Sequence, residues 1–369
     1  MKTQRMAAVS TMALAGVLAL AACGSDNPTT GGTSSAAGGS GSSAAAGDCA
    51  SGTLNGEGSS AQKNAVDEVS RTYQQKCSGA KVNYNPTGSG AGIKQFNAGQ
   101  VDFAGSDSAL KADEATAAEK QCKAPAWNLP MVTGPVAIGY NLEGVSKLVM
   151  TPAVLADIFS GKITTWNDPA IAAANKDAKL PATPIKVFFR SDESGTTENF
   201  TKYLKAAAPE KWTAEASKKW TGKGEGKEKS AGVATAVKSA PGGITYVEWS
   251  YAKDNKLGIA QVDNGGGPVE LTGDNVGKAV AAAKQEGSGN DLKLKLDYAT
   301  KEQGAYPILL VTYEVVCSKY PDATKGKNVK SFLKHFASAD SQELIEQVGY
   351  APLPKSISDK VATAIDAIS

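Results

Sequence analysis

Three short runs of Gly, Ser and Thr lie where an extended segment of the sequence gives way to a helical pattern. They are Gly58-Ser59-Ser60, Gly88-Ser89-Gly90-Ala91-Gly92 and Ser194-Gly195-Thr196-Thr197. A helix start leaves backbone N–H groups unpaired at the positive end of the helix dipole, and small residues let a ligand oxygen approach them. Each run alone is more typical of a simple turn. Together the three runs predict an anion site.

Arg190 and Asp107 refine the kind of anion. Arg190 stands just before the third run, and its planar guanidinium presents a fork of donors that suits a tetrahedral oxyanion. Asp107 follows the alternating segment 101–106 and supplies an acceptor, so the set favours an oxyanion that still carries a proton. Taken alone, Asp107 would sooner be a helix cap. Asp192 either orients Arg190 or caps the following turn.

Strands and helices alternate around these residues. In the first half, strands are expected at 52–56, 81–85 and 101–106, and helices at 61–75 and 92–97. The apolar segment 132–140 leads into a second region with helices at 152–159 and 197–204 and strands at 185–190 and 244–248. After the apolar segment 306–311, the spacing of six residues predicts the buried faces of C-terminal helices: Phe332, Leu333, Phe336, Leu344, Ile345 and Val348. The pattern predicts two α/β domains.

Five stretches carry a resemblance to a known family. They are Val82 to Asp107, Ala153 to Asn167, Arg190 to Thr197, Gly243 to Glu248, and Gly349 to Pro354. In this order they closely resemble the substrate-binding proteins of bacterial phosphate ABC importers. The similarity runs from about residue 54 to the C-terminus.

The resemblance implies an architecture and a function. The fold would be α/β and two-lobed, a type II periplasmic-binding-protein-like fold, with a hinge that the chain crosses twice. Residues 49–134 and 306–369 would form lobe I, and residues 135–305 lobe II. A monomer would bind inorganic phosphate between the lobes outside the cytoplasm and deliver it to the permease and ATPase subunits of an ABC importer.

The resemblance also implies which residues bind phosphate. Lobe I would supply Ser59, Ser60, Ala61, Ser89 and Asp107, and lobe II Arg190, Ser194, Gly195 and Thr196. The Ser60 hydroxyl and the Ala61 N–H would donate to one oxygen and Ser89 to another, whereas Ser59 is expected to cap. Asp192 would orient Arg190. The family has an aromatic residue at the position of Ala61, so the corresponding ring contact is not expected here.

The N-terminal segment has the order of a bacterial lipoprotein signal peptide. Lys2 and Arg5 precede an apolar run from about residue 7 that ends in Leu20-Ala21-Ala22-Cys23. We expect removal of residues 1–22 and lipidation of Cys23. Residues 23–48, rich in Gly, Ser and Ala, would then tether the protein to the outer face of the cell membrane.

The charge balance argues against nucleic acid as a partner. Removal of Lys2 and Arg5 leaves 37 basic and 37 acidic side chains, so the mature chain is close to neutral. The basic stretch 218–229 is interleaved with Gly and Glu and is expected to be a solvated loop.

Four cysteines besides Cys23 suggest two disulfides in an exported protein. Three connectivities are open to them. Proximity favours Cys49 with Cys77, since they flank the first strand and first helix, and leaves Cys122 with Cys317. No Cys-x-x-Cys occurs, so no metal or redox cofactor is expected.

Two rival functions have different requirements. A phosphatase would need a nucleophile with a base, or metals, yet the chain has one histidine, His335, among apolar residues, and no Gly-x-Ser-x-Gly or His-Glu-x-x-His motif. We therefore expect no enzyme. A binder of sulfate or molybdate would share the fold, and Asp107 discriminates against it, because a fully deprotonated anion has no proton to donate. A sensor or surface antigen is compatible with transport.

Overall fold

The structure, a computed structural model, describes residues 49–369. The expected signal peptide, the tether and Cys23 lie outside these residues and stay predictions. Within 49–369, no helix combines the length and apolar character needed to cross a bilayer.

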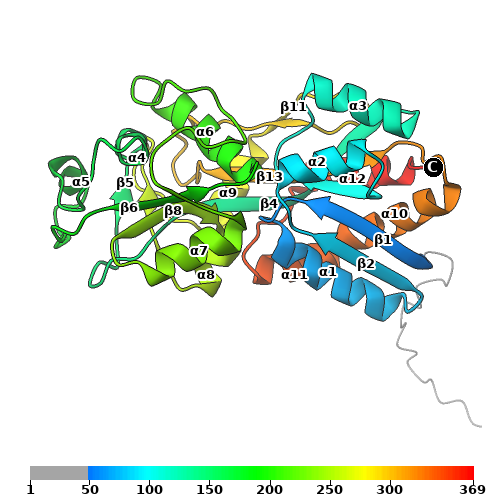
Figure 1. The fold of residues 1–369 in the computed structure, drawn as a ribbon, viewed down its shortest axis with the longest axis horizontal. Helices are drawn as coiled ribbons and strands as arrows, with labels where there is room; N and C mark the ends of the chain where they lie inside the picture. Colours follow the sequence, from blue (N-terminus) through cyan, green and yellow to red (C-terminus); the bar gives the residue numbers. More distant parts are fainter. Residues whose placement is uncertain (1–48) are drawn as a thin grey trace, which may run out of the picture. The chain divides into compact units, whose positions relative to one another are not determined.

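One sheet of nine strands runs through the described part of the chain (Figure 1). Its order is β2 (Ala80–Asn85), β1 (Gly52–Gly58), β3 (Phe103–Ser106), β13 (Leu309–Cys317), β4 (Ala126–Tyr140), β8 (Gly243–Glu248), β6 (Lys186–Arg190) and β7 (Glu225–Lys227), with β9 (Gly258–Ile259) paired to β4. β1 is parallel to β2 and β3, and β6 is parallel to β7 and β8. Between these groups, β13 and β4 run antiparallel to each other. Two short pairs complete the strands: β5 (Val149–Met150) with β10 (Gln261–Val262), and β11 (Lys284–Gln285) with β12 (Leu294–Lys295).

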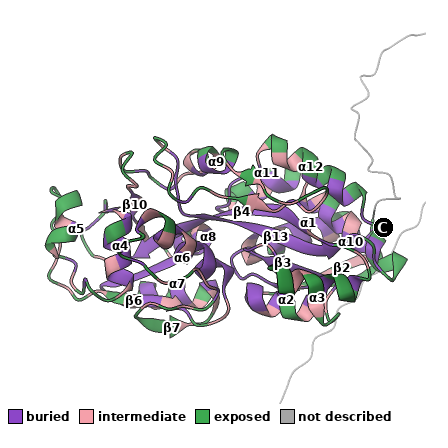
Figure 2. Ribbon diagram, turned by 90° about the horizontal axis from the view of Figure 1, so that it is seen from above, coloured by how far each residue is buried: buried purple, intermediate pink, exposed green. Residues whose placement is uncertain are grey.

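Helices surround the two ends of this sheet. Around β1, β2 and β3 lie α1 (Lys63–Lys76), α2 (Ser89–Asn97), α3 (Ala112–Cys122), α10 (Ala323–Phe336), α11 (Ala339–Gln347) and α12 (Lys355–Asp366). Around β6 and β8 lie α4 (Pro152–Phe159), α5 (Pro169–Ala174), α6 (Gly195–Ala207), α7 (Lys229–Ser239), α8 (Trp249–Asp254) and α9 (Gly273–Ala281). Figure 2 shows the central strands β4 and β13 buried and the outward faces of the helices exposed.

Two hydrophobic clusters divide the described residues into two lobes. Lobe I is built on the cluster around β1, α1 and the C-terminal helices, and lobe II on the cluster around α4, α6 and β8. β4 and β13 contribute to both, since Leu129 and Val315 belong to the first cluster and Ile138 and Leu309 to the second. The two-lobed α/β fold, crossed twice by the chain, is confirmed.

The helices next to the three Gly/Ser/Thr runs begin at other residues than expected. α2 begins at Ser89 rather than at residue 92, and α6 begins at Gly195 because the Ser194 side chain caps it by accepting from the Thr197 N–H at 3.2 Å. α1 begins two residues late, at Lys63, because Ser59 Oγ accepts from the Ala61 N–H at 3.0 Å and holds a turn. Ser89 and Gly195 are thus first residues of helices, where N–H groups are unpaired.

Two disulfides lie in lobe I. Cys49–Cys77 joins the segment before β1 to the end of α1, and Cys122–Cys317 joins the end of α3 to the end of β13. Both therefore connect segments of a single core cluster.

Candidate functional site

A buried polar cluster lies where three strands end and the two lobes meet. Ser59 follows β1, Asp107 follows β3, and Arg190 is the last residue of β6. Their exposed fractions are 1%, 3% and 2%. In open α/β sheets, ligands bind outside the carboxyl ends of the strands. The topology therefore gathers these side chains where a ligand is expected.

The Arg190 guanidinium bonds the Asp192 carboxylate through one edge and two hydroxyl groups through the other. Its Nε donates to Asp192 Oδ1 at 2.7 Å and Nη2 donates to Oδ2 at 2.5 Å. Nη1 donates to Ser230 Oγ at 3.1 Å and to Thr196 Oγ1 at 3.5 Å. Burial alone would raise the pKa of Asp192, but the hydrogen bonds and charge of Arg190 hold that pKa below its usual value. The orienting role expected for Asp192 fits this bidentate geometry.

Both carboxylate oxygens of Asp107 accept hydrogen bonds. Its Oδ1 accepts from Thr312 Oγ1 at 2.8 Å, and its Oδ2 accepts from Ser89 Oγ at 3.3 Å. Burial raises the pKa of Asp107, against the opposing effects of hydrogen bonds from Ser59 and Thr312 and the charge of Arg190. The alternative that Asp107 caps a helix is wrong, because α3 begins at Ala112 with Lys111 as its cap residue.

Expected site residues of each lobe contact groups of the other lobe. The Gly195 N–H donates to Ser89 Oγ at 3.2 Å, and the Ser230 N–H donates to Ser60 Oγ at 3.1 Å. The Gly90 N–H donates to the Glu193 carbonyl at 3.0 Å. Gly88, at φ +104°, allows this approach, since a Cβ there would stand 2.5 Å from a carboxylate oxygen of Asp192.

Two ion pairs also join the lobes. Lys94 Nζ lies 2.6 Å from Glu193 Oε2 at the surface, and Lys218 Nζ lies 2.7 Å from Glu114 Oε1. The Lys218 side chain is only 8% exposed. The expectation of a solvated loop over 218–229 is therefore wrong for Lys218, whose charge Glu114 pairs at a buried position. It is also wrong for residues 225–227, which form β7 beside β6.

Two expected ligand groups are already engaged within their own lobe. The Ala61 N–H donates to Ser59 Oγ and so closes a turn before α1. The cap role expected for Ser59 is wrong, because the N-cap of α1 is Gln62 and no side chain caps this helix. Ser194 Oγ serves as the cap of α6, and the Ser194 N–H donates to the Lys218 carbonyl at 2.9 Å. Ser60, Ser89, Gly195 and Thr196 bring their polar groups to the contact between the lobes.

Three residues of the cluster were missed by the sequence analysis. Ser230, beside Arg190, lies in the first turn of α7, a helix start that follows the basic loop. Thr312 and Glu314 are polar side chains inside the otherwise largely apolar strand β13, and this signal in the sequence could have been noticed. Asn199, one turn after Gly195, donates from Nδ2 to the Asp107 and Gly195 carbonyls at 2.7 and 2.8 Å.

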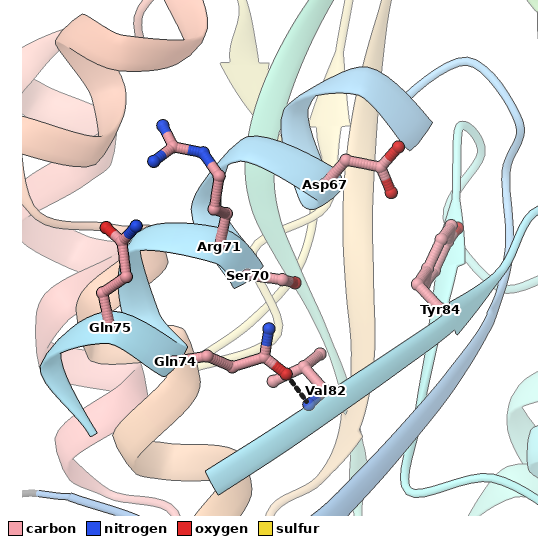
Figure 3. Close-up of a pocket in the computed structure, with 7 residues that line it drawn as sticks. All are labelled: Asp67, Ser70, Arg71, Gln74, Gln75, Val82 and Tyr84. Atoms are coloured by element: carbon pink, nitrogen blue, oxygen red, sulfur yellow. Dashed lines mark hydrogen bonds between the residues drawn. The ribbon is translucent and has the colours of Figure 1, made fainter. Parts of the chain in front are cut away.

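One cavity adjoins the cluster, and one surface pocket lies elsewhere in lobe I. A cavity of about 700 Å³ reaches Asp107 and Asn199 and is walled by Tyr298 and Tyr313. A surface pocket of about 480 Å³ lies between α1 and β2 in lobe I (Figure 3). Its lining is Asp67, Ser70, Arg71, Gln74, Gln75, Val82 and Tyr84. In the described residues, no group of three or more His, Cys, Asp or Glu could hold a metal ion.

Comparison with known proteins places the chain in a family. A family model described as a PBP superfamily domain matches residues 43–340. The chain is 46% identical to the phosphate-binding protein PstS3 of Mycobacterium bovis over 374 residues, covering 100% of both chains. It is 34% identical to the phosphate-binding protein PstS of Xylella fastidiosa over 310 residues, covering 82% of each.

Solved structures share the fold. A high-affinity periplasmic phosphate-binding protein bound with phosphate matches with a TM-score of 0.68 at 24% identity, over 85% of this chain and 93% of that one. A phosphate-binding protein from Stenotrophomonas maltophilia matches with a TM-score of 0.64 at 22% identity, over 85% of this chain and 94% of that one. With its sequence relatives aligned from end to end, the chain belongs to the PstS family of phosphate-binding proteins within the PBP superfamily.

Proposed function

We propose that this protein binds inorganic phosphate between its two lobes and delivers it to the membrane permease of a phosphate ABC importer. The observation that carries the proposal is the buried Arg190 guanidinium, which donates to the Thr196 and Ser230 hydroxyls. In the same cluster, Ser60 and Ser89 of lobe I contact the Ser230 and Gly195 N–H groups of lobe II. Relatives over the full length are named as phosphate-binding proteins, which supports a binding role rather than an enzymatic one.

Each group has a role that follows from hydrogen-bond chemistry. Ser60, Ser89, Thr196 and the Gly195 N–H donate to phosphate oxygens, with Arg190 as the cation. The oxygens replace contacts that these groups now make with one another, such as the bond from the Gly195 N–H to Ser89 Oγ. A buried anion needs this many donors because an unpaired charged group costs several kcal/mol, roughly, when it leaves water.

Asp107 accepts the proton that phosphate keeps near neutral pH. Thr312 and Ser89 already orient its two oxygens, so the carboxylate is aimed before the ligand arrives. Sulfate has no proton, and its oxygen would meet the carboxylate as a like charge. Asp107 is therefore the residue we assign to the choice of anion.

Ser59, Ala61 and Ser194 complete the first and third helix starts. Ser59 shapes the turn before α1, and Ser194 caps α6. The Ala61 N–H becomes a ligand donor only if its bond to Ser59 Oγ is exchanged for one to phosphate.

Binding and lobe closure are one event in this proposal. We keep the boundaries 49–134 with 306–369 and 135–305, with β4 and β13 as the two crossings. Donors from both lobes reach the same anion only when the lobes meet, so the ion pairs Lys94–Glu193 and Lys218–Glu114 mark the closed form. A permease that recognises this form distinguishes a loaded carrier from an empty one.

We also propose that the protein acts outside the cytoplasm as a monomer tethered through lipid on Cys23. The support is the order of charged start, apolar run and Leu-Ala-Ala-Cys in the sequence. Mass spectrometry of the membrane fraction tests it, and an N-terminal peptide that retains Leu20 would overturn it.

Calorimetric titration of residues 49–369 with phosphate, arsenate and sulfate tests the function. We expect tight binding of phosphate and arsenate and no measurable heat with sulfate. Tight sulfate binding would make the protein a binder of another oxyanion, and no binding of any of the three would refute the assignment of the site.

A further inference from the structure

Another buried carboxyl group, that of Glu314, lies near the proposed phosphate site, and both of its oxygens lack hydrogen-bond partners. Glu314 on β13 is fully buried, and neither Oε1 nor Oε2 has a partner among the described residues. Thr312, two residues earlier on the same strand, donates to Asp107. Because side chains two residues apart point to the same face of a strand, Glu314 lies on the Asp107 side of the sheet.

The amide of Gln62 adjoins Glu314. In the pairing of β3 with β13, Gly105 stands opposite Glu314. A Cβ on Gly105 would stand 2.0 Å from Gln62 Nε2 and 2.4 Å from Tyr84 Oη, so the absence of a side chain at Gly105 makes room for both. Directly opposed residues have Cβ atoms roughly 5 Å apart, which brings Glu314 and the Gln62 amide together.

The hydrogen-bond donors and acceptors around Gln62 fix the orientation of its side-chain amide. Tyr84 Oη donates its proton to the Ser59 carbonyl at 2.9 Å, because a carbonyl cannot donate. Tyr84 Oη must then accept in its contact with Gln62, which is 3.0 Å from Nε2. Gln62 Oε1 is consequently left as an acceptor, and it has no donor.

An ionised Glu314 cannot satisfy that acceptor, because a carboxylate only accepts, whereas a protonated carboxyl donates one O–H bond. We propose that Glu314 is a positioning residue that stays protonated at neutral pH, donates to Gln62 Oε1, and through Gln62 and Tyr84 holds the Ser59 turn of the anion site. The chain of bonds then runs without interruption from β13 to the turn that precedes α1. Its effect on affinity rests on the proposed phosphate function, whereas the protonation of Glu314 does not.

The surroundings of Glu314 agree with this assignment. Burial raises the pKa of Glu314 to about 8. Donation from the Gln62 amide to an ionised Glu314 would oppose this rise, and the negative charge of Asp107 adds to it. Burial raises the pKa of the Tyr84 and Tyr320 phenol groups, and the charge of Glu314 raises both further. Both phenols are therefore uncharged at neutral pH. In unfolded chains the pKa of Glu is about 4.3. The protonated group therefore favours the folded state at low pH, and this contribution is lost as pH rises from about 4.3 to about 8.

Infrared difference spectra test the protonation directly. At pH 6, wild type minus Glu314→Gln should contain a protonated-carboxyl C=O band that disappears as pH is raised through about 8. Glu302→Gln, a change at an exposed carboxyl, should remove no such band. A Glu314→Gln difference spectrum with only carboxylate bands at pH 6 would overturn the proposal.

Stability and affinity measurements test the chain of bonds. The stability advantage of wild type over Glu314→Gln should shrink between about pH 4.3 and 8. Phosphate affinity should stay within threefold of wild type in Glu314→Gln at pH 6, because the new amide can donate to Gln62 Oε1. It should fall about tenfold in Glu314→Leu and in Gln62→Leu, and no further in the double variant.

The outcomes separate the two proposals. If wild type binds no phosphate but the infrared band is present, the proposed function fails and the protonated Glu314 stands. If phosphate binds and the band is missing, or if the two leucine changes add independently, the inference about Glu314 is wrong. Thermal unfolding of each variant at pH 6 identifies any loss of affinity that comes from misfolding.

Discussion

Replacing Arg190 by alanine should abolish useful phosphate affinity. The side chain is 2% exposed, and it makes four hydrogen bonds, two to Asp192 and one each to Thr196 and Ser230. Its removal leaves the anion without the cation of the cluster in a place that water does not reach.

The expected loss of phosphate affinity follows from the burial of the charge pair that Arg190 forms with the anion. Removing one partner of a buried, hydrogen-bonded charge pair costs about 2 to 5 kcal/mol, which raises Kd by about 30-fold to 5,000-fold. Arg190→Lys keeps the charge but loses the planar fork, since one ammonium cannot bond Asp192 twice and also reach Ser230. We therefore expect Arg190→Lys to recover only part of the affinity.

Arg190→Ala should also lower stability, because it leaves Asp192 as a mostly buried carboxylate without its cation. The companion variant Arg190→Ala with Asp192→Asn removes this charge, so it should regain stability but no phosphate affinity. Arg71→Ala is the matched control, because the Arg71 side chain is 53% exposed and pairs with Glu68 at the surface. It should leave Kd unchanged.

The assay is isothermal titration of phosphate at constant ionic strength, with thermal unfolding of every variant. A Kd for Arg190→Ala within about threefold of wild type, which is less than 1 kcal/mol, would refute the site. So would an equal loss in Arg71→Ala.

Two further predictions concern selectivity and stability. Asp107→Asn should relax the rejection of sulfate more than it weakens phosphate binding, because an amide can rotate to donate or accept; an unchanged ratio of the two calorimetric Kd values would remove Asp107 from its role. Serine substitution of Cys122 and Cys317 should lower the free energy of unfolding by about 5 kcal/mol, and of Cys49 and Cys77 by about 3.5 kcal/mol, because the pairs are 195 and 28 residues apart. Denaturant titration measures the free energy of unfolding of both disulfide variants. Equal losses of stability in the two variants would contradict the loop-length argument.

Local chemistry made much of the site predictable from the sequence. Small residues and hydroxyls mark helix starts whatever the rest of the chain does, so the runs at Ser59, Ser89 and Ser194 were recognisable as turns and caps. Arg190 and Asp192 are two residues apart, and their bidentate contact is likewise a local arrangement. The expected strand at 244–248 and helix at 152–159 agree within a residue with β8 and α4, because both are short apolar segments with clear ends.

Tertiary structure decided which distant groups complete the site. Thr312 reaches Asp107 across 205 residues of sequence because β13 returns to lie beside β3, and no local pattern specifies that neighbour. Ser230 joins Arg190 only through the packing of α7 against β6 and β8. The sequence by itself predicted Arg190, Asp107 and the small-residue runs as one anion site, because residue type and turn preference are local properties. The fold alone decided that the Glu314 carboxyl group is buried beside Gln62, because strand order sets which side chains lose contact with water.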